Sequence, residues 1–263
     1  MSRAITAVLL VAFAASSSAA ETRADRQRTR RILAVGGALV VYATSEIVLK
    51  SAFTPENCTW CSVPGIDASM RSHLRWSDPE LARDLSNLTG YVLAPLGTGG
   101  LLLLASRHVA DEGRWMTFTD DLIAVFEAAA YSQFFVQAVK FSFGRQRPYV
   151  HYATEPLPYE NDHNVSFFSG HSTLTFSIAV AAGSVATRRG YSLAPVIWGT
   201  SLALAATTAY LRVAGDRHYF TDVLTGSVFG AAAGIVIPRL TGSLPDRITV
   251  APTTNGLQVV GSF

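Results

Sequence analysis

The feature that most constrains the fold is a series of apolar segments with few or no charged residues. They recur along most of the chain and are separated by polar stretches. No alternation of apolar and polar residues, as a half-buried strand would show, occurs before the C-terminal tail. We therefore expect an all-α protein, a bundle of about six apolar helices. The segments cover residues 32–45, 91–106, 122–139, 172–187, 192–211 and 223–237.

Composition favours a bundle that is embedded in a membrane. Hydrophobic residues make up 49% of the 263 residues and charged residues 15%, against about 25% charged residues in an ordinary soluble domain. Most segments are shorter than the roughly 20 apolar residues that span a bilayer, so each could equally be a buried helix of a soluble core. The net charge of +2 is too small to indicate nucleic acid as a partner.

The N-terminal residues have the three regions of a secretory signal peptide. A basic start at residues 1–3 is followed by an apolar run over 4–15 and by small residues up to Ala20. Residues 22–31 then carry five arginines directly before the apolar segment 32–45, and such charge tends to hold a segment end in the cytoplasm. Two interpretations stay open, a cleaved signal peptide and an uncleaved signal-anchor.

Cys58 and Cys61 form a CxxC pair in a segment rich in polar and turn residues. A redox site would need a strand-helix pattern around the pair, and a zinc site would need two more ligands from scattered histidines such as His73. We therefore favour a small disulfide clip, made in an oxidising compartment, or a pair of free thiols.

Strand-like alternation is confined to the C-terminal tail. Residues 247–250 and 256–260 flank the turn signal Pro-Thr-Thr-Asn-Gly, and this pattern predicts a short hairpin. We assign no function to it.

The first cluster of chemically useful residues ends the apolar segment 122–139. It reads Lys-Phe-Ser-Phe-Gly-Arg-Gln-Arg-Pro from Lys140 to Pro148, which places three cations, Lys140, Arg145 and Arg147, at a helix end and in the following loop. Alone, they would be a solvated rim as often as a binding site.

The second cluster is Ser169-Gly170-His171, which opens the apolar segment 172–187. A helix N-terminus offers unpaired backbone N–H groups and the positive end of a dipole, and both favour anions. Gly170 lets the backbone approach a ligand closely. Ser169 could also be a simple helix cap.

The third cluster contains Arg212, His218 and Asp222. The last two are four residues apart, so on a helix they share a face, and the carboxylate can accept a hydrogen bond from one imidazole nitrogen. The other nitrogen is then available to attack, which is the recurring arrangement of covalent catalysis. The alternative is a His-Asp pair that only stabilises a helix start.

Together, Lys-x6-Arg-Pro, Ser-Gly-His and Arg-x5-His-x3-Asp resemble the motifs of the type 2 phosphatidic acid phosphatase family. The same fold occurs in bacterial non-specific acid phosphatases and vanadium haloperoxidases. The sequence departs from the family pattern at Phe168, where proline is usual, and at Leu211, where serine is usual. The resemblance divides the chain into residues 1–20 (signal peptide or signal-anchor), 21–84 (basic segment, first helix and CxxC loop), 85–240 (phosphatase-like core) and 241–263 (tail).

The resemblance implies a role for each residue of the three clusters. His218 would attack phosphorus, Asp222 would orient it, and His171 would act first as acid and then as base, which suits an imidazole pKa near 6.5. The phosphate would be bound by Lys140, Arg147, Ser169, Gly170 and Arg212. No metal and no other cofactor is required, because these cations neutralise the phosphoryl oxygens.

The expected function is metal-independent hydrolysis of a phosphomonoester or diphosphate, with a lipid phosphate or a small phosphoester as substrate. If residue 32 onward runs outward, the arginines at 107, 114, 188 and 189 fall inside and all three clusters fall outside. We thus expect a bacterial inner-membrane protein with a periplasm-facing site. The alternatives are a soluble periplasmic acid phosphatase, a vanadium haloperoxidase, and a membrane transporter or scaffold without catalytic activity.

Overall fold

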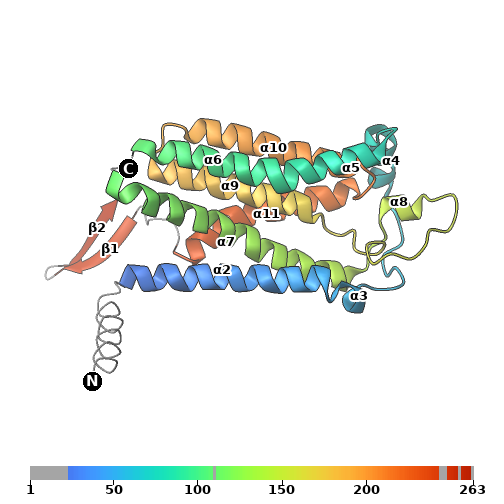
Figure 1. The fold of residues 1–263 in the computed structure, drawn as a ribbon, viewed down its shortest axis with the longest axis horizontal. Helices are drawn as coiled ribbons and strands as arrows, with labels where there is room; N and C mark the ends of the chain where they lie inside the picture. Colours follow the sequence, from blue (N-terminus) through green and yellow to red (C-terminus); the bar gives the residue numbers. More distant parts are fainter. Residues whose placement is uncertain (1–22, 109–110, 243–247, 254–255, 262–263) are drawn as a thin grey trace, which may run out of the picture.

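The computed structural model describes residues 23–108, 111–242, 248–253 and 256–261, so the predicted signal peptide or signal-anchor at residues 1–20 lies outside the described residues. The fold is a bundle of long helices that run roughly side by side (Figure 1). The long helices are α2 (Arg23–Ile47), α7 (Asp111–Phe143), α9 (Gly170–Arg189), α10 (Ala194–Ala214), α11 (Phe220–Leu240) and the continuous run of α5 (Pro79–Leu88), η1 (Thr89–Leu93) and α6 (Ala94–Ala105).

Each of the six predicted apolar segments lies within one of these helices, apart from at most two residues at one end, so the all-α prediction is confirmed. Short helices connect them at the two ends of the bundle: α3 (Lys50–Phe53), α4 (Gly65–Leu74), η2 (Ser106–His108) and α8 (Pro148–His151). The predicted hairpin is also present, as antiparallel strands β1 (Ile248–Thr253) and β2 (Gly256–Gly261).

Helix α9 forms the centre of the bundle and packs against α6, α7, α10 and α11. Most of its residues are buried, and its small side chains allow close neighbours. On α11, Gly230 lies against the Thr173 carbonyl so closely that an added Cβ would clash with it. Serine and glycine mark the two ends of α9, because Ser169 caps the first turn and Gly190 adopts a left-handed conformation (φ 67°) after the last.

Among the residues that the structure describes, four helices are long and apolar enough to cross a membrane: Pro79–Ala105, Gly113–Phe143, Ala194–Ala214 and Phe220–Leu240. Their outer faces carry large exposed apolar side chains, including Leu96 at 70% and Leu240 at 81% exposure. Exposed apolar side chains in such numbers are typical of a surface that meets lipid. The helices therefore support a membrane protein.

Two of the N-terminal arginines, Arg28 and Arg31, form ion pairs with α7. Arg28 donates to Asp120 of α7 at 2.7 Å, and Arg31 donates to Glu127 of the same helix at 2.9 Å. These pairs attach the start of α2 to the middle and early part of α7. Arg189 at the end of α9 pairs with buried Asp121, so the same end of the bundle holds several ion pairs that the sequence pattern did not predict.

Candidate active site

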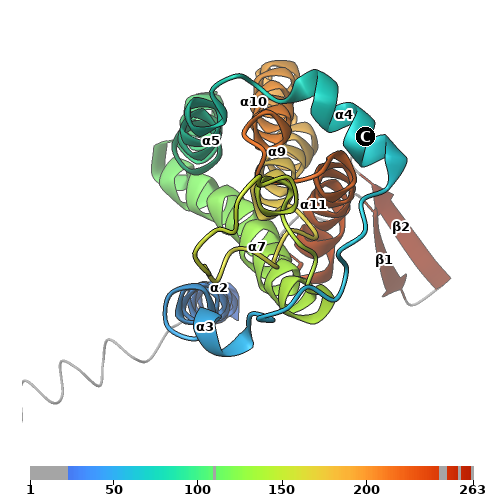
Figure 2. The ribbon, with the colours of Figure 1, turned by 90° about the vertical axis from the view of Figure 1, so that its right-hand side faces the viewer.

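The three predicted clusters meet at the other end of the bundle (Figure 1, right-hand side). There the C-terminal ends of α7 and α10 lie beside the N-terminal ends of α9 and α11, as the end-on view in Figure 2 shows. They enclose a pocket of about 200 Å³. The pocket is lined by Tyr42, Glu46, Arg83, Asn87, Tyr91, Gln133, Lys140, Arg147, Asp162, Gly170, His171, Arg212, Arg217 and His218.

His218 is buried in the loop between α10 and α11, at 2% exposure. Its Nδ1 lies 2.8 Å from the carbonyl oxygen of Ser166. A carbonyl can only accept a hydrogen bond, so Nδ1 carries the proton and Nε2 bears the lone pair. Nε2 accepts a hydrogen bond from Arg147 Nη1 at 3.3 Å, which places the lone pair beside a cation in the pocket.

Asp222 does not contact His218 in the way that the sequence predicted. Its Oδ2 lies 3.7 Å from His218 Nδ1, too far for a hydrogen bond. The carboxylate accepts instead from the Ser166 hydroxyl at 2.6 Å and from the Tyr219 N–H at 3.0 Å. The backbone carbonyl of Ser166 accepts the hydrogen bond from Nδ1, so Asp222 is linked by hydrogen bonds to His218 through Ser166. The carboxylate itself does not line the pocket.

His171 lies in the first turn of α9 and faces His218 across the pocket. Its Nε2 lies 2.9 Å from Asn87 Oδ1, and its ring packs against Tyr91 with the ring centroids 4.5 Å apart. Asn87 and Tyr91 belong to α5 and η1, so the run from α5 to α6 fixes the orientation of this imidazole.

The three predicted phosphate-binding cations all reach the pocket, from three different elements. Arg147 donates to the backbone oxygens of Asp162 and Arg217 at 2.7 and 2.9 Å. Arg212 is buried, donates to Ser86 Oγ at 3.0 Å and leaves its Nε without an acceptor. Within the described part of the chain, neither Lys140 nor Arg212 forms an ion pair with a carboxylate. Positive charge is therefore available for an anion.

Gly170 and Ser169 have different positions. Gly170 lines the pocket, and an added Cβ there would lie 3.5 Å from Lys140 Nζ. Ser169 is fully buried and does not line the pocket. Its Oγ accepts from the Ser172 N–H at 3.4 Å and from the Ser172 hydroxyl at 2.9 Å. The structure thus shows Ser169 as the cap of α9, the alternative that the sequence left open.

Burial and neighbouring charge decide the protonation of the groups outside the candidate spans. Desolvation and the nearby Arg147 lower the pKa of His218 well below its usual value. Desolvation and Arg212 lower the pKa of His171 in the same way. Arg147 also lowers the pKa of Asp162, which stays ionised. Both imidazoles are therefore neutral near pH 7.

Several residues of the site were not predicted. Glu46 and Tyr42 of α2 line the pocket, although α2 lies far from the three clusters in the sequence. Glu46 accepts from Gln137 at 2.6 Å. Asp162, in the polar loop before Ser-Gly-His, accepts a hydrogen bond from Lys50 Nζ at 2.6 Å. For Tyr42 and Glu46, the only sequence signal was a polar side chain within or directly after an apolar segment, and for Asp162 it was the polar loop 159–164.

Cys58 and Cys61 form a disulfide, which confirms the clip interpretation. Among the described residues, no three His, Cys, Asp or Glu side chains gather as a metal site would require.

Comparison with known proteins identifies the core of the chain. The PAP2 superfamily profile matches residues 121–244, whereas no match was found among curated protein sequences. The fold is similar to a transmembrane PAP2-type phosphatidylglycerolphosphate phosphatase from Bacillus subtilis, with 15% identity and a TM-score of 0.45 over 83% of this chain and 98% of that one. It is also similar to LpxE from Aquifex aeolicus, with 21% identity and a TM-score of 0.37 over 59% of this chain and 93% of that one. The matched residues 121–244 contain all three motifs, so this part of the chain is similar to the PAP2 superfamily.

Proposed function

We propose that this protein is a phosphatase that hydrolyses a phosphomonoester or a diphosphate of a lipid through a phosphohistidine on His218. The observation that carries the proposal is the meeting of two imidazoles and three cationic side chains around one small pocket. Phosphoryl transfer depends mainly on positioning and on neutralising oxygen charge. The PAP2 superfamily match supports the same class of reaction.

The proposed reaction has two steps. The Nε2 lone pair of His218 attacks phosphorus, the bond from phosphorus to the leaving oxygen breaks, and His171 gives that oxygen a proton. His171 then takes a proton from water, whose oxygen attacks the phosphohistidine and releases phosphate. Because phosphate brings negative charge close to His171, substrate binding raises its pKa and favours the protonated acid that the first step needs.

Lys140, Arg147 and Arg212 would hold the phosphoryl oxygens, and Gly170 would leave room for them beside the start of α9. Three cations at these positions supply the charge that a magnesium ion supplies in other phosphatases. We expect full activity after extensive dialysis against EDTA. A loss that only a divalent metal restores would contradict this part of the proposal.

The apolar helices around the pocket support a lipid substrate. A panel of phosphatidate, phosphatidylglycerol phosphate, undecaprenyl diphosphate and p-nitrophenyl phosphate tests it by phosphate release. We expect kcat/KM to be highest for a lipid. Good hydrolysis of p-nitrophenyl phosphate alone would favour a soluble-type acid phosphatase, which the small, polar pocket also suits. Halide oxidation that depends on vanadate would instead favour a haloperoxidase.

We also propose that the site faces the periplasm from the inner membrane. The basic start of α2 and the end of α9 with Arg188 and Arg189 lie at the end of the bundle opposite to the pocket, as a cytoplasmic end would. An epitope inserted in the exposed loop 154–158 should bind antibody in spheroplasts with an intact inner membrane. Release of the protein by alkaline carbonate would argue for the soluble periplasmic alternative.

A further inference from the structure

Arg145 lies behind the pocket and does not line it. Its fully buried side chain bridges two fully buried carboxylates, Asp67 of α4 and Asp222 of α11. Nη2 donates to Asp67 at 2.6 Å, and Nη1 donates to Asp222 and to Thr221 Oγ1. A guanidinium has a rigid fork of donors that suits two acceptors at once. Arg145 therefore fixes the position of Asp222.

A continuous set of hydrogen bonds leads from Arg145 to the nucleophile. Asp222 accepts from the hydroxyl of Ser166 at 2.6 Å, and the Ser166 carbonyl accepts from His218 Nδ1 at 2.8 Å. The Ser166 N–H donates to the Arg145 carbonyl at 2.9 Å. Arg145 thus holds Ser166 from its backbone and, through Asp222, from its side chain. Any shift of the arginine would move the group that selects the tautomer of His218.

Arg145 is itself held between two aromatic rings. Its guanidinium carbon lies 4.1 Å from the ring centroid of Trp60 and 4.4 Å from that of Tyr219. The backbones also pair, because Gln146 N donates to the Trp60 carbonyl at 3.2 Å and Thr59 N donates to the Gly144 carbonyl at 3.0 Å. Trp60 is therefore the contact through which the CxxC loop fixes the arginine.

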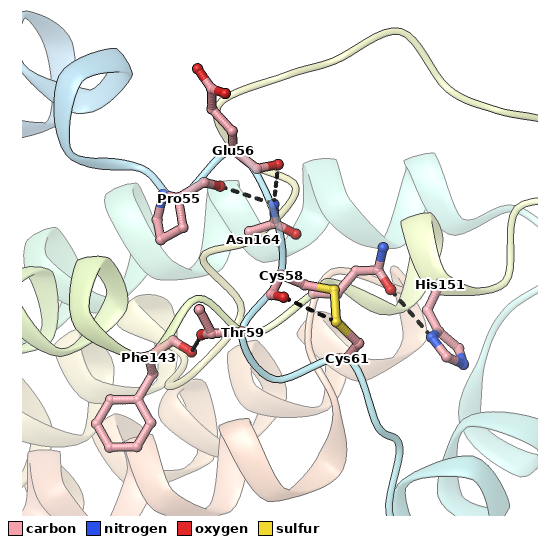
Figure 3. The surroundings of a disulfide bond; sticks show 9 residues. Pro55, Glu56, Cys58, Thr59, Cys61, Phe143, His151 and Asn164 are labelled. Carbon is pink, nitrogen blue, oxygen red and sulfur yellow. Dashed lines mark hydrogen bonds between the residues drawn. A yellow bond between two sulfur atoms is a disulfide. The ribbon is translucent and has the colours of Figure 1, made fainter.

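The disulfide closes a short loop around this tryptophan. In the sequence, Trp60 lies between Cys58 and Cys61, and Figure 3 shows the bond that joins these two cysteines. Figure 3 also shows the anchors of the loop: Asn164 donates to the carbonyls of Pro55 and Glu56 at 2.9 Å each, and Thr59 donates to the carbonyl of Phe143. The loop thus joins the end of α7 to the segment that carries Ser166.

We propose that Arg145 is a positioning residue for His218, and that the Cys58–Cys61 disulfide sets the position of Arg145 through Trp60. The consequence is a phosphatase whose turnover depends on the oxidation state of this pair. Reduction by a dithiol breaks the S–S bond, places one proton on each sulfur and converts the dithiol to its own disulfide. The loop is then free to relax, and Trp60 loses its fixed place over the guanidinium.

The inference rests on the proposed phosphatase reaction, and its experiment separates the two. Purified oxidised protein is assayed on the best substrate of the panel before and after treatment with dithiothreitol, with thiol labelling to confirm reduction. We expect kcat to fall about tenfold or more, the size that loss of an outer hydrogen-bond partner often has, with KM and inhibition by inorganic phosphate changed less than about twofold. An oxidised protein without phosphatase activity would refute the proposed function, whereas an active protein that ignores reduction refutes only this inference.

Variants test each contact in turn. Cys58→Ser/Cys61→Ser should match the reduced protein and ignore dithiothreitol. Trp60→Ala should lower kcat and Trp60→Phe should restore most of it, because an aromatic ring is kept over the cation. Arg145→Lys should lower kcat with little change in KM, since lysine cannot bridge both carboxylates. The matched control is Arg189→Lys, in the pair with buried Asp121 at the opposite end, which should retain normal kcat and normal reduction sensitivity.

Circular dichroism at the assay temperature separates positioning from folding. We expect the helical signal to stay unchanged on reduction and in Trp60→Ala. Loss of helical signal in parallel with activity would overturn the inference, because the disulfide would then be only a structural support. Normal kcat in Arg145→Lys would overturn it as well. If the double cysteine variant does not fold, reduction of the folded wild-type protein still decides the question.

Discussion

The two ends of the bundle use basic residues in opposite ways. At the end of the bundle where α2 begins, Arg28, Arg31 and Arg189 are paired with Asp120, Glu127 and Asp121. At the pocket end, Arg212 and Lys140 have no carboxylate partner within the described residues, and Arg147 has only Asp162 at 3.6 Å. The three arginines at the first end are neutralised by carboxylates, whereas the cations at the second end keep positive charge in the pocket.

This difference shows which basic residues serve stability and which serve function. A buried arginine with a carboxylate partner stabilises the fold, because breaking such a pair leaves an uncompensated charge. A buried cation without a partner costs stability, and a site that binds an anion can tolerate that cost. Arg145 stands between these cases, since it is paired twice and its backbone carbonyl also accepts from Ser166, which contacts His218.

The largest expected effect concerns His218, which the unpaired cations surround. His218→Asn should lower kcat by roughly 10³-fold or more, because the nucleophile is lost, while the melting temperature stays near the wild-type value. Denaturing gels after incubation with ³²P-labelled substrate should show label on wild-type protein and none on the variant. His151→Asn, at an exposed histidine that ends α8, is the control. An active His218→Asn enzyme would rule out the covalent mechanism.

The next effect concerns an unpaired cation. Arg212→Met should lower kcat/KM by roughly 10²- to 10³-fold, since one donor to the transition-state oxygens is removed. Its melting temperature should equal or exceed that of wild type, because a buried charge without a carboxylate partner disappears. Steady-state kinetics and thermal unfolding of the same samples check both statements. A marked drop in melting temperature would assign Arg212 to the structural class.

The paired end should respond in the opposite way. Arg31→Met removes an ion-pair partner of Glu127, which is 1% exposed and also accepts from Thr241, and should lower the free energy of unfolding by about 3 kcal/mol. Activity per folded molecule should stay within about twofold, because the change lies at the far end of the bundle. Denaturant unfolding and active-site titration give the two numbers. A specific loss of kcat without loss of stability would break the comparison.

The smallest effect is a dependence of stability on pH. The pKa of His218 in the folded protein is lowered, while an unfolded histidine has a pKa of about 6.5. Below that pH the unfolded chain binds a proton that the folded site excludes, so stability is complete above about pH 7 and falls as the pH decreases through 6.5, by at most about 1.4 kcal/mol per pH unit. Thermal unfolding from pH 8 to 5 should show this slope, and His218→Asn should reduce it. Equal slopes would mean that His218 is charged in the folded protein.

Much of the fold could be predicted from the sequence, because apolar periodicity and segment length report helices directly. The six apolar segments, the hairpin in the tail and the disulfide clip are all present. The partners of the N-terminal arginines could not be predicted, because Arg31 and Glu127 are 96 residues apart and no local pattern links them. The sequence indicated only that these arginines tend to hold a segment end in the cytoplasm, and it did not predict that Arg28 and Arg31 pair with α7.

The site shows a similar division. Lys140, Arg147, Gly170, His171, Arg212 and His218 line one pocket, as the motifs predicted. The expected hydrogen bond between Asp222 and His218 is replaced by hydrogen bonds through Ser166, because His218 lies in the loop before α11 and not on the helix. Helical spacing predicts which side chains share a face only where the backbone of both residues is helical, and α11 begins after His218.

The sequence by itself determined the helices, the residues with phosphate chemistry and their order along the chain, since each depends on local composition and spacing. The tertiary structure decided which cations remain without a carboxylate among the described residues, which groups hold the two imidazoles, and that the disulfide loop packs against Arg145. These properties depend on distances between residues far apart in the chain, such as Arg145 and Asp222, 77 residues apart. Only the packing of α4, α7, α9 and α11 sets those distances.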